Sequence, residues 1–167
     1  MCNTRTFSKI LIAFDGTEGS VKALKTAEKM AKLHDASLTV TYVYNGTAAS
    51  RDTDTFESVI TPIIYNSANA TASDDRNVYH QQSNVTENVS ETILSDAKNR
   101  LTDAITEVNY HILEGDQAKE ICTFANDEEF DLIVIGNRGH TGVKKIVLGS
   151  VSNTVTNLAN CPVLVVK

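Results

Sequence analysis

The chain has 167 residues, of which 41% are hydrophobic and 22% charged, and its formal net charge is -6 at pH 7. This length and balance are typical of one globular domain with a substantial hydrophobic core. The negative charge argues against nucleic acid as the main partner, and no apolar run approaches the ~18 residues that a membrane-spanning helix needs. Three scattered cysteines, with neither CxxC nor metal-ligand spacing, favour a reduced, cytoplasmic setting.

The first part of the chain predicts a strand, a helix and a second strand. Lys9–Phe14 is a compact apolar run that stops at Asp15 and Gly16, which indicates a buried strand followed by a turn. Asp15 ends this run where a signal peptide would continue, so we do not expect one here. Ser20–Leu33 has apolar residues at helical spacing, and Ser37–Tyr44 is β-branched and aromatic, as in a strand.

Regular patterning is lost between about residues 45 and 84. This polar insert is rich in Asn, Ser, Thr, Asp and Ala, and we expect a long surface connection with a short helix near Asp54–Ile60. Beyond the insert, apolar residues recur every four positions and predict a long amphipathic helix. These residues are Val85, Val89, Ile93, Ala97, Leu101 and Ile105.

The last part of the chain alternates strands and helices. Asn109–Leu113 predicts a short strand, and Asp116 can cap the helix that follows it. Asp131–Ile135 predicts a further strand, Ser150–Ala159 a helix, and Pro162–Val166 a final strand. Apolar strands that alternate with helices favour a parallel sheet that is covered on both faces.

We therefore expect one α/β domain over residues 1–167, interrupted by the polar insert at about 45–84. Its core would be a doubly wound five-stranded parallel sheet with helices on both faces, which is a Rossmann-like arrangement. In such sheets ligands bind beyond the carboxyl ends of the strands, where the strand order reverses. The first and fourth strands, which end near Asp15 and Gly136, would be neighbours there.

A glycine-rich run near the C-terminus predicts an anion site. Gly136, Gly139 and Gly149-Ser150 follow the spacing G-x2-G-x9-G-S, between a predicted strand and a predicted helix. Glycines let backbone amides approach an anion closely, and a helix N-terminus carries unpaired N–H groups and partial positive charge. The segment Leu132–Lys167 has four basic residues and no Asp or Glu, which suits a small anionic ligand such as a phosphate.

This spacing closely resembles the nucleotide loop of the universal stress protein family, in its ATP-binding branch. Both ends of the chain share the resemblance. KILIAFDGTEGSVKALKTA is similar to the family's first strand, Asp-Gly turn and first helix, and GSVSNTVTNLANCPVLVV to its last helix and edge strand. The resemblance implies the family's adenine nucleotide alpha hydrolase-like fold, whereas the insert matches nothing specific.

The resemblance also implies roles for individual residues. Asp15 would lie near the ribose or the metal-phosphate end of a nucleotide, which Ala13 and Phe14 would border, and Val43 would meet the adenine largely through its backbone. Expected beside the ribose and phosphates are Ile135 and Gly136. Expected to wrap the phosphates, with backbone N–H groups and two hydroxyls, are Gly139, Gly149, Ser150, Val151 and Ser152. Arg138 is a further candidate for a place near the phosphates.

Each of these residues also has a purely structural interpretation. The glycines could serve turns and caps, and Asp15 could cap the first helix or shape its turn. Ser150 and Ser152 could be capping hydroxyls, Val43 could simply be a core residue, and Arg138 could lie on a solvated loop face.

The function that we expect is that of an ATP-binding universal stress protein with a regulatory or stress-adaptation role. Mg²⁺ or Mn²⁺ would bind through the phosphates, and hydrolysis of ATP would be slow at most. The chain has no Walker A sequence, nucleophile elbow or HExxH zinc motif, so we assign no catalytic and no metal-ligating residues.

Two alternatives stay open: a non-nucleotide dimeric protein that acts through protein partners, and a true nucleotide hydrolase or nucleotidyl-transfer enzyme. The resemblance also implies a homodimer through the apolar edge strand 162–166. We expect an adenine nucleotide as ligand, and neither nucleic acid nor a membrane as partner.

Overall fold

The computed structural model of the chain describes residues 7–45, 78–102, 107–137 and 148–167. Five strands form one all-parallel sheet in the order β3-β2-β1-β4-β5. The strands are β1 (Lys9–Ala13), β2 (Ser37–Tyr44), β3 (Val108–Glu114), β4 (Leu132–Gly136) and β5 (Val163–Val166). The helices are α1 (Glu18–His34), α3 (Val78–Arg100), α4 (Gln117–Asp127) and α5 (Ser150–Leu158). The predicted alternation of strands and helices is confirmed.

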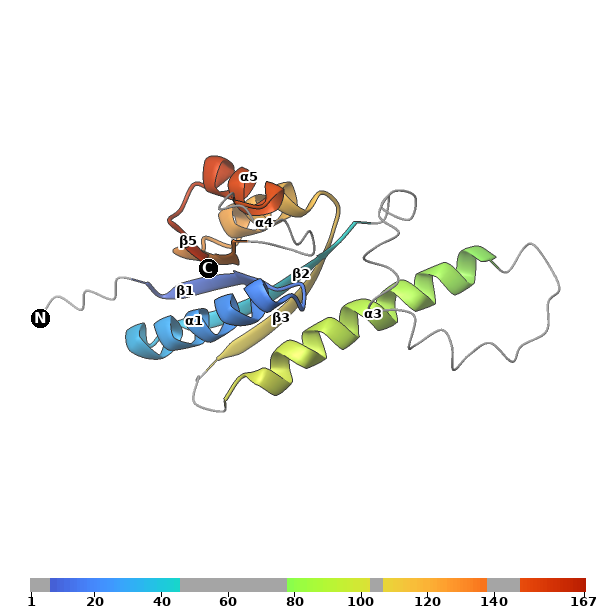
Figure 1. Cartoon of the computed structure of the whole chain (residues 1–167), viewed down its shortest axis with the longest axis horizontal. Helices are drawn as coiled ribbons and strands as arrows, with labels where there is room; N and C mark the ends of the chain where they lie inside the picture. Colours follow the sequence, from blue (N-terminus) through green and yellow to red (C-terminus); the bar gives the residue numbers. More distant parts are fainter. Residues whose placement is uncertain (1–6, 46–77, 103–106, 138–147) are drawn as a thin grey trace, which may run out of the picture.

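Helices cover both faces of the sheet, with α1 and α3 on one face and α4 and α5 on the other (Figure 1). Successive side chains of a strand point to opposite faces, so β1 contributes to two separate clusters. Ile10 and Ile12 pack with α1 and α3, whereas Leu11 packs with α4 and α5, and all three are fully buried. The predicted doubly wound, Rossmann-like α/β fold is confirmed. Among the described residues, no helix has the length and apolar character needed to cross a bilayer.

The helix α3 corrects the predicted extent of the polar insert. It spans Val78–Arg100, so the connection expected to continue to about residue 84 gives way to helix earlier. Its first residues, VYHQQSN, are mostly polar but include neither Gly nor Pro, and helix formation there needs no apolar periodicity. Leu101 lies just beyond the helix, while Ile105 and the helix expected near Asp54–Ile60 fall outside the described residues.

The buried face of α3 also differs from the predicted one. Over residues 89–100, where burial is described, the most buried residues are Ser90, Leu94 and the predicted Ala97, with Val89 and Ile93 only half-buried. An α-helix has 3.6 residues per turn, so each step of four residues rotates about 40° past a full turn. Residues spaced strictly by four therefore rotate away from the face that contacts the sheet. The buried residues Ser90, Leu94 and Ala97 are instead spaced by four and then three.

A buried carboxylate fastens α1 to the segment after α3. The Glu28 side chain is 10% exposed, and its Oε1 accepts hydrogen bonds from Lys32 Nζ at 2.8 Å and Thr102 N at 3.1 Å. The Thr102 hydroxyl donates to the same oxygen. Burial raises the pKa of Glu28, but the hydrogen bonds from Lys32 and Thr102 outweigh it, and the pKa lies below its usual value.

A second carboxylate joins the starts of β1 and β4. Asp131 Oδ2 accepts hydrogen bonds from Ser8 Oγ at 2.6 Å, Ser8 N at 2.7 Å and Lys9 N at 2.8 Å. The Ser8 hydroxyl bond lowers the pKa of Asp131, against the effect of burial, and the two backbone bonds add to that lowering. This contact holds the edge of the sheet that lies opposite the strands' carboxyl ends.

These two carboxylates predict how stability depends on pH. Because their folded-state pKa values lie below the ordinary values of about 4, the unfolded chain takes up protons first as the pH falls. The stabilisation is complete above about pH 5 and is lost as the pH falls through the folded-state values. We expect the urea midpoint of the double variant Glu28→Gln/Asp131→Asn to be lower at pH 7 and to fall less steeply below pH 5. The variant Asp127→Asn/Glu129→Gln, which alters two exposed carboxylates, is the control. Equal slopes for the first variant and the unchanged protein would contradict this account.

Candidate functional site

The strand order reverses between β1 and β4. Ala13, the last residue of β1, pairs with Thr41 of β2 on one side and with Ile135 of β4 on the other. The chain therefore leaves β1 toward β2 and β3, and later returns to the opposite side of β1. The predicted adjacency of the first and fourth strands is confirmed, and the position that favours a ligand lies beyond their carboxyl ends.

The turn after β1 is built around Asp15. Phe14 is buried, and its N–H donates to Thr41 O at 2.8 Å, which extends the sheet by one residue. The half-buried Asp15 accepts hydrogen bonds from Thr17 N at 3.0 Å and Thr17 Oγ1 at 2.6 Å, both at Oδ1. Thr17 in turn caps α1 by accepting from Ser20 N at 3.2 Å. Asp15 thus has a structural role through one of its two carboxylate oxygens.

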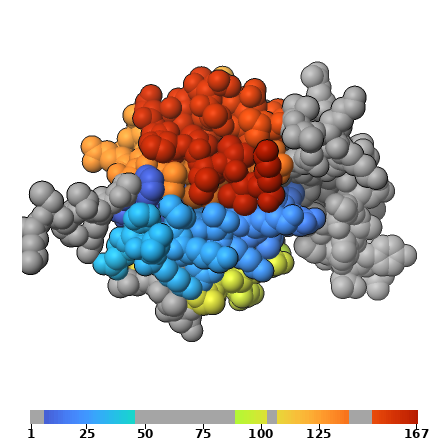
Figure 2. Space-filling model, turned by 60° about the vertical axis from the view of Figure 1, so that its left-hand side comes forward, coloured from blue at the N-terminus to red at the C-terminus, as the bar shows by residue number. Residues whose placement is uncertain are grey.

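Gly136 allows α1 to lie against the end of β4. A Cβ added at this residue would lie 2.7 Å from Gly19 C, 2.9 Å from Gly19 O and 3.0 Å from Ser20 N. These neighbours are backbone atoms of the first turn of α1, which cannot move aside independently. Close packing against α1 therefore requires glycine at position 136. Figure 2 shows α1, in blue, directly against the red C-terminal segment.

Helix α5 begins at the end of β4 with a glycine cap. Gly149 has extended backbone angles (φ -61°, ψ 159°), and its N–H donates to Asn137 O at 2.8 Å. The caps of α1 and α4 accept backbone hydrogen bonds through their side chains. Thr17 caps α1, as described above, and Asp116 caps α4 by accepting from Lys119 N at 3.0 Å, which confirms the predicted cap. Within the described residues, the cap of α5 makes no such side-chain hydrogen bond. Its first-turn amides and positive helix end meet the carboxyl edge of the sheet.

The three residues after this cap differ in exposure. Ser150 is exposed and Val151 is half-buried, whereas Ser152 is only 3% exposed. The Ser152 hydroxyl donates to two backbone carbonyls, Asn137 O at 3.2 Å and Gly149 O at 3.0 Å. Its hydrogen therefore points into the protein. These contacts give Ser152 a structural role, but not the predicted one of a capping hydroxyl, because a cap accepts from an amide N–H whereas Ser152 donates to carbonyls.

The remaining predicted residues form an apolar floor or lie outside the described structure. Ala13 is half-buried at the end of β1, and Ile135 and Val43 are 5% and 6% exposed in the cluster beneath α4 and α5. Arg138 and Gly139 fall outside the described residues. The structure thus brings Ala13 and Ile135 side by side at the carboxyl edge, with Val43 on the neighbouring strand β2.

Three residues at this edge were not predicted from the sequence. Thr17 had a detectable signal, since a threonine just before a helical segment can cap the helix by accepting from the backbone N–H three residues on. Tyr42 is half-buried, its burial raises its pKa, and the nearby Asp15 charge raises the pKa further. Asn137 contributes through its backbone, so no side-chain pattern could reveal it. Among the described residues, no three His, Cys, Asp or Glu side chains gather in a way that could hold a metal ion.

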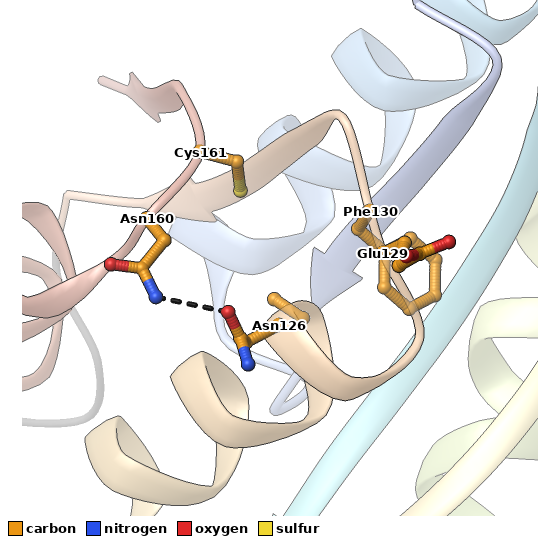
Figure 3. A pocket seen from close by; sticks show the side chains of 6 residues that line it. Asn126, Glu129, Phe130, Asn160 and Cys161 are labelled. Carbon is orange, nitrogen blue, oxygen red and sulfur yellow. Dashed lines mark hydrogen bonds between the residues drawn. The ribbon is translucent and has the colours of Figure 1, made fainter.

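A separate pocket lies at the opposite, amino edge of β4 and β5. It has a volume of about 290 Å³, and Figure 3 shows its side chains between the end of α4 and the segment before β5. Asn160 Nδ2 donates to Asn126 Oδ1 across it at 3.0 Å. Its lining residues are Ala125, Asn126, Glu129, Phe130, Asn160 and Cys161. None of the residues predicted to contact a nucleotide is among them.

With this geometry described, comparison with known proteins decides the family. A sequence model of the universal stress protein family matches residues 6–167. The chain belongs to this family. It is 34% identical to the stress response protein NhaX of Bacillus subtilis (strain 168), over 95% of this chain and 97% of the relative. It also resembles the solved structure of MJ0577 of Methanocaldococcus jannaschii, with a TM-score of 0.69, 27% identity and coverage of 97% and 96% of the two chains.

Two further solved structures share the fold and contain adenine nucleotides. One is a universal stress protein in complex with cAMP, with a TM-score of 0.62, 20% identity and coverage of 96% and 97%. The other is the Archaeoglobus fulgidus universal stress protein in complex with dAMP, with a TM-score of 0.60, 20% identity and coverage of 97% and 99%.

The tight contact at Gly136 predicts a large loss of stability on substitution. We expect Gly136→Ala to lower the free energy of unfolding by about 3 kcal/mol, because the new Cβ must displace the first turn of α1. The control is Gly16→Ala, where the added Cβ meets nothing within 4 Å and the φ of 80° alone costs about 1 kcal/mol. Urea denaturation measures both losses. A loss for Gly136→Ala no larger than that of the control would contradict the packing role.

Proposed function

We propose that this universal stress protein binds an adenine nucleotide, foremost ATP, and acts in the cytoplasm as a nucleotide-dependent regulatory protein of stress adaptation. The observation that carries the proposal is the glycine-capped start of α5 at the reversal of strand order. A helix N-terminus without a side-chain acceptor favours an anion, and the carboxyl ends of β1 and β4 are where a doubly wound sheet takes its ligand. Phosphate oxygens would accept the hydrogen bonds that a capping side chain accepts in α1 and α4.

The described residues suggest how the nucleotide would lie. The adenine would rest on the apolar floor near Ala13 and Val43. Phe14, whose side chain packs on the opposite face of the sheet with α1 and α3, would border the nucleotide through its backbone. The ribose would approach Asp15, whose Oδ1 is engaged by Thr17, so that Oδ2 is the oxygen to offer. Proposed beside the ribose and phosphates are Ile135, Gly136, Arg138, Gly139, Gly149, Ser150, Val151 and Ser152. Since the Ser152 hydroxyl donates to carbonyls, Ser152 would contribute its backbone N–H.

The comparisons support the adenine nucleotide class. cAMP and dAMP, the ligands of the two solved neighbours, both combine adenine with a phosphate group. The site described above offers a partner for each of these groups: an apolar floor for the adenine and a helix N-terminus for the phosphate. Membership of the universal stress protein family supports the role in stress.

Mg²⁺ or Mn²⁺ would bind through the phosphates and neutralise part of their charge. Asp15, which follows directly on β1, is a carboxylate at the same edge of the sheet. We propose that hydrolysis is slow at most, because phosphoryl transfer needs a positioned water and charge stabilisation. Asp15 is the candidate to orient that water, but one of its carboxylate oxygens already accepts hydrogen bonds from Thr17.

The proposal predicts the effect of giving α5 a side-chain cap. In Gly149→Asp, a carboxylate would occupy the first-turn amides and repel phosphate, so we expect ATP affinity to fall about tenfold or more. Gly149→Ser is the matched control, since its neutral hydroxyl caps the helix without repulsion and should lower affinity less. Both residues cap helices at least as well as glycine, so neither variant should lower the melting temperature. Isothermal titration calorimetry with ATP, with and without Mg²⁺, measures the affinity. Equal affinity of the Asp variant and the unchanged protein would contradict the site.

A second candidate function, a dimer that acts through protein partners, is favoured by β5. This edge strand consists of four half-buried apolar residues, Val163–Val166, and exposed strand edges pair readily with other chains. Ile133 N–H donates to Pro162 O, and Asn137 N–H donates to Val166 O. Alternate residues of β5 therefore direct their backbone N–H and C=O groups toward β4, and the residues between them direct these groups outward. Val165 is one of the outward-facing positions.

The homodimer proposed through strand 162–166 can be tested at Val165. Val165→Pro removes an outward N–H that a partner strand would need, without touching the bonds to β4. We expect the unchanged protein to sediment as a dimer at micromolar concentration, and the proline variant to shift toward monomer. Val165→Thr, which keeps the N–H and the branched side chain, should remain dimeric. A monomer in every case would contradict the dimer.

A further inference from the structure

The backbone of Asn137 connects three elements of the proposed nucleotide site. Its N–H donates to Val166 O of the edge strand β5 at 2.8 Å. Its carbonyl accepts two hydrogen bonds from the start of α5, from Gly149 N at 2.8 Å and Ser152 Oγ at 3.2 Å. The end of β4, the amino end of α5 and the end of β5 therefore meet at one residue.

Ser152 is the side chain that completes this junction. It is 3% exposed, and its hydroxyl lies 3.0 Å from Gly149 O as well as 3.2 Å from Asn137 O. A serine hydroxyl has one hydrogen to donate, and both nearby acceptors are backbone carbonyls of the junction. Its oxygen is thus turned toward the base of α5 rather than outward with the exposed Ser150.

We infer that Ser152 is a positioning residue: it holds the amino end of α5 on Asn137 and, through Asn137, joins the nucleotide site to the edge strand β5. This inference rests on the proposed nucleotide function for its ligand, but the junction itself is independent of it. Loss of the hydroxyl would let the cap residue Gly149 shift relative to β4, and with it the amides that are proposed to receive phosphate.

The junction makes binding and strand pairing interdependent. A nucleotide that holds α5 in place also holds the Asn137 carbonyl, and so favours the Asn137–Val166 bond at the end of β5. By linkage, any pairing at β5 that stabilises this bond favours nucleotide binding by the same factor. Regulation of the site would therefore pass through the C-terminal strand.

Amide hydrogen exchange and calorimetry on three variants test this inference. Ser152→Ala removes the hydroxyl, Ser152→Thr keeps one, and Ser150→Ala removes the exposed hydroxyl on the same helix. Without nucleotide, we expect Ser152→Ala to speed exchange of the Asn137 and Gly149 amides by about three- to tenfold, which is the effect of one hydrogen bond. Ser152→Thr should restore slow exchange, and Ser150→Ala should leave it unchanged.

Calorimetry with ATP then separates positioning from direct contact. We expect Ser152→Ala to weaken ATP binding by about three- to tenfold, in step with the faster exchange, and Ser152→Thr to recover it. Weaker binding with unchanged exchange at Asn137 and Gly149 would make Ser152 a direct phosphate donor and overturn the inference. If the unchanged protein binds no ATP, the proposed function fails. The exchange measurements still decide whether Ser152 holds the junction.

Discussion

The hydrogen bond from Gly149 N to Asn137 O, 2.8 Å long, fixes the start of α5 at the carboxyl end of β4. The proposed site depends on this contact, because it sets the first-turn amides of α5 beside the reversal of strand order. The fold supplies the rest of the geometry. Ala13 pairs with Ile135, so β1 and β4 end together, and Asp15 follows directly on the β1 side.

Several residues at this edge have structural roles. Asp15 orients Thr17 through Oδ1, Gly136 makes room for the backbone of Gly19, and Ser152 ties α5 to Asn137. The sequence allows both a structural and a functional interpretation of Asp15 and of Ser152. The observed hydrogen bonds are compatible with both, since they engage Asp15 Oδ1 and the Ser152 hydroxyl, and not Asp15 Oδ2 or the Ser152 N–H that are proposed to meet a nucleotide.

Local patterns in the sequence predicted the fold well. Ser37–Tyr44 was predicted with the bounds that β2 has, because a β-branched and aromatic run has little alternative to a strand. Asp116 was predicted as a cap because an aspartate directly before a helical segment can accept from its first amides. The start of α3 at Val78 was missed, since its polar first turns carry no periodic signal. The reason for glycine at position 136 was hidden as well, because Gly19 approaches from a distant part of the chain.

Backbone NMR during titration with ATP tests the central claim most directly, because it locates the ligand on the molecule. The account predicts that the largest shifts fall on the amides of Asp15, Gly136 and residues 149–152, at the carboxyl edge of the sheet. The amides of Asn126, Glu129 and Cys161, around the pocket at the opposite edge, should stay in place. Shifts confined to that pocket, with none at residues 149–152, would contradict the account.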